Sequence, residues 1–154
     1  MTSATLNEDF FDMLEALVGN RVRFVVVGAL ALAVHGIPRA TGDIDIFVEP
    51  TPDNARRVMN ALISFGAPVA AHGISSGDFV SQGFVYQIGL PPRRIDILTE
   101  ISGVTFDEAW SDRVTADVNG LDVPFIGRDA MIRNKIASGR GKDLIDAEEL
   151  RKNQ

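Results

Sequence analysis

The sequence contains no cysteine, and only two of its 154 residues are histidine. The lack of cysteine excludes disulfide bonds and thiolate metal sites, and it suits the reducing cytosol. Any metal ion would therefore be held by oxygen ligands or by the two histidines. We accordingly expect a cytoplasmic protein in which carboxylates carry any metal chemistry.

Long hydrophobic runs are also absent. The longest apolar stretch, residues 24–34, is too short to span a bilayer, and the first ten residues are polar and acidic, unlike a signal peptide. We therefore expect no membrane segment and no secretory leader. The hydrophobic fraction of 45% and the charged fraction of 23% are typical of a globular protein, and the length predicts a single domain over residues 1–154.

Positive charge is scarce, because 15 lysines and arginines stand against 21 acidic residues and give a net charge of −6. This balance argues against a protein that coats nucleic acid through its overall field. The segment 128–142 is nevertheless locally basic and contains one acid, Asp129, which suits a site for a polyanionic ligand. Its basic residues are Arg128, Arg133, Lys135, Arg140 and Lys142.

Helical and strand-like patterns alternate along the chain, which predicts an α/β (α+β) fold. The apolar run over residues 22–27 predicts a central strand that is buried on both faces. Asn119-Gly120 is a strong hairpin signal, and a capping box at residues 5–8 predicts the start of the first helix. We expect strands at 22–27, 43–48, 84–90, 94–98, 114–118 and 121–125, and helices ending at Gly19 and spanning 29–34, 52–65, 130–138 and 143–150.

Two aspartates alternate with apolar residues in the run Asp43-Ile44-Asp45-Ile46-Phe47-Val48. In a strand, Asp43 and Asp45 would project from the same face, roughly 6.6 Å apart along the backbone. Aspartate is unfavourable in strands and neighbouring like charges repel, so the pair predicts a bound cation. A solvated edge strand is the simpler interpretation of an isolated Asp-x-Asp. However, a second run at 94–98 places Asp96 in the same alternating setting.

A glycine turn, Gly28-Ala29, leads from the first apolar run into a segment of helical composition. A dinucleotide-binding motif would need further glycines where the chain has Leu30 and Ala33, so we reject that interpretation. A tight turn that serves packing alone is one explanation, and backbone amides that contact a phosphate are the other. The neighbouring aspartates favour phosphate binding.

Three carboxylates beside a phosphate turn indicate metal-dependent chemistry. Mg²⁺ prefers oxygen ligands and is commonly held by one or two carboxylates together with substrate phosphates. Two such ions about 3.5–4 Å apart can activate an attacking hydroxyl and stabilise a departing pyrophosphate. Asp43 and Asp45 would hold the metal, and Asp96 would complete the cluster and help to take the proton from the hydroxyl. Because clustered carboxylates repel, at least one pKa should be raised in the absence of metal.

These motifs resemble those of the nucleotidyltransferase superfamily, which has the polymerase-beta-like fold. The resemblance rests on the turn at Gly28-Ala29, on Asp43-Ile44-Asp45-Ile46 after thirteen intervening residues, and on Asp96 as the third carboxylate. It implies a central mixed β-sheet flanked by helices. Further segments, which bring the matched region to about residues 22–150, are similar to small bacterial members that include abortive-infection-type toxins: His35-Gly36, Arg39-x-Thr41, Asn134-Lys135 and Gly139-Arg140-Gly141-Lys142-Asp143-Leu144 with Asp146.

The resemblance implies an enzyme that transfers NMP from an NTP to a hydroxyl with Mg²⁺ or Mn²⁺ and releases pyrophosphate. Asp43, Asp45 and Asp96 would be its catalytic and metal-binding residues. The acceptor would be RNA, such as tRNA, or a protein, as in toxin-like members that have a cognate antitoxin. The residues that would contact the nucleotide and its phosphates are Gly28, Ala29, Arg39, Thr41, Lys135, Lys142 and Asp143.

Other interpretations stay open. Ala29 stands where the family has Gly or Ser, which favours a non-catalytic nucleotide- or partner-binding module that kept the fold. A small-molecule, antibiotic-type acceptor is a further alternative. Arg39 and Thr41 fit an ordering contact to Asp43 or Asp45 as well as a phosphate contact. His35 fits a structural hydrogen bond better than a ligand role, and Asp143 also fits the cap of the last helix.

Overall fold

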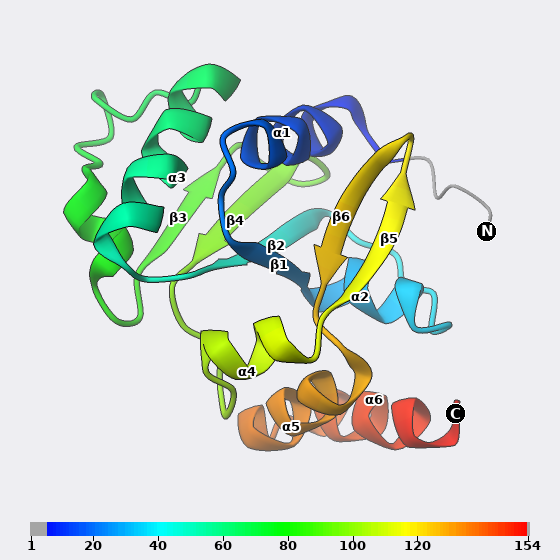
Figure 1. Cartoon of the computed structure of the whole chain (residues 1–154). Coiled ribbons are helices and arrows are strands. Elements are labelled where there is room, and N and C mark those ends of the chain that lie inside the picture. Colours follow the sequence, from blue (N-terminus) through cyan, green and yellow to red (C-terminus); the bar gives the residue numbers. More distant parts are fainter. Residues whose placement is uncertain (1–5, 154) are drawn as a thin grey trace.

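The computed structural model describes residues 6–153, in which six strands form one mixed β-sheet (Figure 1). The strand order is β3-β4-β2-β1-β6-β5. The pairs β2–β4 and β1–β6 are parallel, and the other three neighbouring pairs are antiparallel. The predicted mixed sheet with flanking helices is therefore confirmed. The strands are β1 (Phe24–Val27), β2 (Asp43–Val48), β3 (Val85–Ile88), β4 (Arg94–Leu98), β5 (Val114–Val118) and β6 (Leu121–Phe125).

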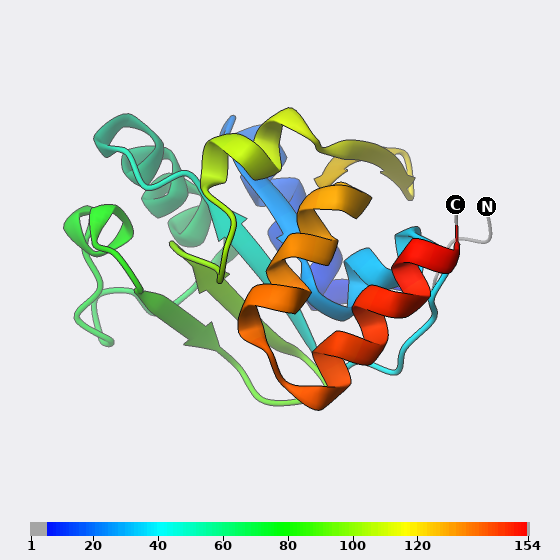
Figure 2. The ribbon, with the colours of Figure 1, turned by 90° about the horizontal axis from the view of Figure 1, so that it is seen from below.

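Helices cover both faces of this sheet (Figure 1, Figure 2). One face carries α1 (Glu8–Gly19) and α3 (Pro52–Phe65), and the other carries α4 (Phe106–Ser111), α5 (Arg128–Ser138) and α6 (Gly141–Lys152). Two short elements complete the described chain, namely α2 (Gly28–Val34) directly after β1 and the 3-10 helix η1 (Ser76–Val80) beside α3. A search of the described residues finds no helix with the length and apolarity needed to cross a membrane.

The alternation along β2 sorts its side chains between the two faces of the sheet. Phe47 packs edge-on against Phe106 of α4, with 5.3 Å between the ring centroids. Asp43 and Asp45 share the face of Phe47, so they project on the side of the sheet that α4 covers. Ile44, with the other even-numbered residues of β2, is buried on the opposite face.

The strand and hairpin predictions hold closely. All four residues of β1 are buried, as expected for a central strand. The turn between β5 and β6 has positive φ at both Asn119 (51°) and Gly120 (88°), which is the requirement of a two-residue type I′ hairpin. The strands at 85–88 and 94–98 pair antiparallel around the predicted proline turn.

Several boundaries differ from the prediction. Thr5 lies outside the described residues, and the cap of α1 is Asn7, whose side chain accepts a hydrogen bond from the Phe10 amide. The last helix begins at Gly141, so the interpretation of Asp143 as its cap is wrong. No helix is predicted at 106–111, where a capping box between Thr105 and Glu108 starts α4.

Candidate active site

The parallel pairing of β2 and β4 brings the three predicted aspartates together. In the register of this pair, Asp45 lies opposite Asp96, and Asp43 lies opposite Arg94. Because opposite residues of neighbouring strands point to the same face, all four side chains converge on the side of α4. One carboxylate oxygen from each aspartate lies within 4.8 Å of the others. Three acids from two separate segments thus share one small volume.

Gly28 lies directly against this cluster. Its φ of 74° is in the left-handed region, and a Cβ atom built on it would overlap Asp45 Oδ2. Any other residue would therefore be strained in its backbone and would collide with the carboxylate. The glycine turn consequently lets the start of α2 approach Asp45, as expected if substrate phosphates lie at the acidic cluster.

Arg94 is a member of the cluster that the sequence interpretation missed. Its Nη2 donates to Asp43 Oδ2 at 2.7 Å and to Asp96 Oδ2 at 3.3 Å, and its Nε lies 3.1 Å from Asp96 Oδ1. The available signal was its position, two residues before Asp96 on the same face of a strand. The acidic site, as we call Asp43, Asp45 and Asp96 together with Arg94, therefore has three acids and one cation.

The close approach of the three acids changes the pKa of Asp45. Its pKa is raised to about 7, first by burial and then by the charges of Asp43 and Asp96 and a hydrogen bond with Asp96. Arg94 opposes the rise only in part. The expectation of at least one raised carboxyl pKa is met at the aspartate closest to Gly28.

Thr41 and Arg39, which precede β2, have different partners. Thr41 Oγ1 donates to the Asp43 backbone carbonyl at 2.5 Å, which is an ordering contact at the start of the strand. Arg39 pairs instead with Asp146 at 2.6 Å and with Glu149 at 3.6 Å, both on α6. The interpretation of Arg39 as a salt-bridge partner of Asp43 or Asp45 is therefore wrong.

The predicted residues of the C-terminal segment form a second cluster. Lys135 Nζ lies 3.4 Å from both Asp143 and Asp146, and Arg140 Nε lies 2.8 Å from Asp143. Both aspartates are almost fully buried, at 2% and 1% exposure. Lys142 is exposed and belongs to no ion pair among the described residues. The α5–α6 charge cluster, by which we mean Lys135, Arg140, Asp143 and Asp146 together with Arg39, holds the two helices and the loop before β2 together.

His35 Nε2 lies 2.8 Å from the Ile126 carbonyl oxygen, which gives this histidine the structural role that was expected.

The acidic site fits a divalent cation such as Mg²⁺ or Mn²⁺. The atoms that would ligate the ion are carboxylate oxygens of Asp43, Asp45 and Asp96, and these hard cations prefer oxygen ligands. Their separation of up to 4.8 Å suits ligands arranged around one ion, or shared between two neighbouring ions. Asp96 Oδ1 is buried and accepts no hydrogen bond within residues 6–153, and its one cationic neighbour there is Arg94 Nε at 3.1 Å.

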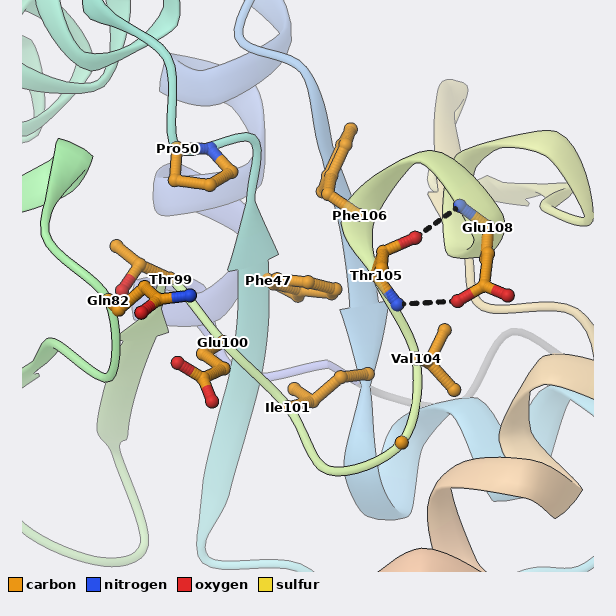
Figure 3. A pocket seen from close by; sticks show the side chains of 11 residues that line it. Phe47, Pro50, Gln82, Thr99, Glu100, Ile101, Val104, Thr105, Phe106 and Glu108 are labelled. Carbon is orange, nitrogen blue, oxygen red and sulfur yellow. Dashed lines mark hydrogen bonds between the residues drawn. The ribbon is translucent and has the colours of Figure 1, made fainter.

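A hollow of about 390 Å³ lies between the ends of β2 and β4 and the start of α4, and no residue of the acidic site lines it (Figure 3). Its lining includes Phe47, which follows Asp45 by two residues on the same face of β2. Figure 3 shows Thr105 and Glu108 at its rim, held together by the two hydrogen bonds of the α4 cap.

Comparisons with known proteins agree with this geometry. A family model described as "Nucleotidyltransferase of unknown function (DUF6036)" matches residues 6–152 of the chain. A crystal structure of a "putative nucleotidyltransferase" from Thermotoga maritima aligns with a TM-score of 0.55 and 18% sequence identity, covering 93% of this chain and 88% of that one. At this identity the likeness bears on the fold alone. No curated protein matches the sequence.

Proposed function

This chain belongs to the nucleotidyltransferases of unknown function whose family model it matches, and from this premise we propose that it transfers NMP from an NTP to a hydroxyl group. The acceptor oxygen would form a new bond to the α-phosphorus, and the bond from that phosphorus to the leaving pyrophosphate would break. The hydroxyl proton would pass to a carboxylate of the acidic site. The products are the nucleotidylated acceptor and pyrophosphate.

One observation carries this proposal, the convergence of Asp43, Asp45 and Asp96 within 4.8 Å beside Gly28. A solvated edge strand does not account for it, because β2 is an interior strand, paired on both sides. Placing three acids this close together, one of them buried, with a single arginine is unfavourable unless a further cation joins them. The arrangement is what a metal-dependent phosphate site requires.

The residues of the site have distinct proposed roles. Asp43 and Asp45 would hold Mg²⁺ or Mn²⁺, and Asp96 would complete the metal site and receive the proton of the hydroxyl. The bound metal would supply charge stabilisation for the phosphates and for the attacking oxygen. Asp45 must lose its proton before it can act as a ligand. Gly28 and Ala29 are proposed to contact the phosphates through their backbone amides.

The acceptor remains a proposal with two candidates. The first candidate is an RNA, such as tRNA, or a protein, with a toxin-like role and a cognate antitoxin, and the basic segment 128–142 supports it. However, Arg133, Lys135 and Arg140 are each paired with an acid of the same chain. These pairs leave less free positive charge for a polyanionic acceptor, which favours the second candidate, a small-molecule acceptor.

Incubation with each α-labelled NTP, Mg²⁺ and either total RNA, lysate or a library of small hydroxyl compounds would test the proposal. Asp43→Ala/Asp45→Ala is the inactive comparison, and Asp122→Ala, which changes an exposed acid at the β5–β6 hairpin, is the matched control. Transfer that is lost in the double variant and kept in Asp122→Ala supports the enzyme. Nucleotide binding without transfer to any acceptor would support the non-catalytic module that Ala29 suggests.

A further inference from the structure

Arg94 occupies a position between two of the proposed metal ligands. A single nitrogen atom, Nη2, contacts Asp43 Oδ2 and Asp96 Oδ2 together, at 2.7 Å and 3.3 Å. The Nε atom adds a contact of 3.1 Å to Asp96 Oδ1. The guanidinium thus joins two carboxylates in the way that a bridging cation would.

The sheet fixes this placement. Arg94 lies opposite Asp43 in the parallel register and precedes Asp96 by two residues on the same face. Among the ion pairs of residues 6–153, no other lysine or arginine contacts the three aspartates. The side chain of Arg94 is only partly buried, at 30% exposure, so it has solvent-facing space into which it can turn.

A divalent cation and a guanidinium cannot share these oxygens without repulsion. Two positive charges a few ångströms apart repel strongly, and Arg94 contacts both oxygens of Asp96 and one oxygen of Asp43. A metal ion ligated by Asp96 would therefore compete with Arg94 for the same oxygen atoms. Arg94 is therefore expected to change the affinity of the site for a divalent cation.

We propose that Arg94 is the displaceable counter-ion of the acidic site, which holds Asp43 and Asp96 until a divalent cation takes its place. This inference rests on the proposed function and adds to it a competition between an internal and an external cation. The released guanidinium stays on the same face of the sheet. There the phosphates of an NTP are a suitable partner for it.

The test compares Mn²⁺ binding to the full chain, without nucleotide, for wild type, Arg94→Gln and Arg93→Gln. Arg93 offers a matched control because it is the neighbouring arginine, more exposed and paired with Asp9 rather than with the acidic site. Removing the competing charge should lower the Kd of Arg94→Gln by roughly tenfold, whereas Arg93→Gln should stay within roughly twofold of wild type. Calorimetry or the electron spin resonance signal of free Mn²⁺ measures the Kd directly.

The opposite result has a clear meaning. If Arg94 orients the carboxylates and stays in place when metal binds, Arg94→Gln should bind Mn²⁺ more weakly, by roughly ten- to a hundredfold. Weaker or unchanged binding in Arg94→Gln, with tight binding in wild type, overturns the counter-ion role and leaves the proposed function standing. No Mn²⁺ binding by any of the three proteins would overturn the counter-ion role, whereas NMP transfer decides the proposed function, because the metal can also enter the site together with substrate phosphates.

A second measurement uses the unmodified protein, in case Arg94→Gln does not fold. The side-chain Nε–H signal of Arg94 in a nitrogen-15 spectrum, assigned with Arg94→Lys, should shift and lose protection from hydrogen exchange when Mg²⁺ is added. The signals of other arginines should not change. An Arg94 signal that is insensitive to saturating Mg²⁺ would contradict the displacement.

Discussion

The two charged clusters of this protein use the same residue types with opposite results. The acidic site contains three aspartates and one arginine. The pKa of Asp45 is raised there to about 7 by burial and by its acidic neighbours. The α5–α6 charge cluster surrounds two buried aspartates with Lys135, Arg140 and Arg39. There, burial raises the pKa of Asp143, but hydrogen bonds from Ser138 and Arg140 and the charge of Lys135 lower it overall.

The comparison separates charges that stabilise a fold from charges that are prepared for a ligand. Buried acids are tolerated when hydrogen-bonded cations surround them, as in the α5–α6 charge cluster. In the acidic site the acids outnumber the cation, which lowers stability and is the reason we propose that a cation from outside completes the site. Substitutions in the acidic site should therefore reduce activity most, and substitutions in the α5–α6 charge cluster should reduce stability.

Asp96→Asn should reduce NMP transfer by at least roughly a thousandfold, or about 4 kcal/mol of transition-state stabilisation. The reason is that the amide cannot replace a carboxylate as a metal ligand or proton acceptor. Initial rates with a labelled NTP measure the effect. Asp122→Asn, at the exposed hairpin, should retain the wild-type rate. Comparable rates in wild type and Asp96→Asn would refute the catalytic assignment.

Lys135→Met should lower the free energy of unfolding by about 3 kcal/mol, because it leaves Asp143 and Asp146 buried with fewer partners. Lys142→Met, which changes an exposed lysine of the same segment, should cost about 0.5 kcal/mol or less. Urea denaturation gives both values. An activity loss in Lys142→Met without a stability loss would support its predicted contact with the nucleotide.

Gly28→Ala should cost about 1–2 kcal/mol of stability because of its positive φ, and should also reduce transfer by displacing Asp45. Gly139→Ala is the matched comparison, since Gly139 has φ 71° at the end of α5 but meets no atom closer than 3.9 Å. It should show the stability loss alone. Equal activity in the two alanine variants would mean that the close approach to Asp45 has no role.

Asp45→Asn should change the pH dependence of stability. Because the pKa of Asp45 is raised in the folded state, the folded protein binds more protons than the unfolded chain between about pH 4 and pH 7. Its contribution to stability is therefore complete below pH 4 and is lost as the pH rises through 7. The asparagine variant should become more stable relative to wild type across this range, as urea titrations at several pH values would show. A pH-independent difference would contradict the raised pKa.

The sequence predicted most of the fold because its local signals agree with its tertiary structure. The apolar run before Gly28, the alternation at Asp43–Val48 and the Asn119-Gly120 turn each match the element that forms there. Helix α4 at 106–111 was not predicted. It is only six residues long, its one local signal is the capping box of Thr105 and Glu108, and it is stabilised by the packing of Phe106 on Phe47, which depends on the tertiary structure.

The candidate site shows the same division. Alternation alone puts Asp43 and Asp45 on one face and gives Asp96 the same kind of setting, so the three acids were predictable from the sequence. The partners of Arg39 and the role of Arg94 were not, because ion pairs depend on which elements meet. Arg39 reaches Asp146 across 107 positions, and Arg94 reaches Asp43 across 51.

By itself, the sequence determined most of the secondary structure, the three candidate carboxylates and the nucleotidyltransferase resemblance, since these depend on periodicity and on the spacing of a few residues. Only the tertiary structure decided the parallel register of β2 and β4, which sets Asp45 opposite Asp96 and Arg94 opposite Asp43. That register follows from the burial of residues such as Ile44 and Ile95 on the other face. The hydrophobic core therefore aligns the charges of the site.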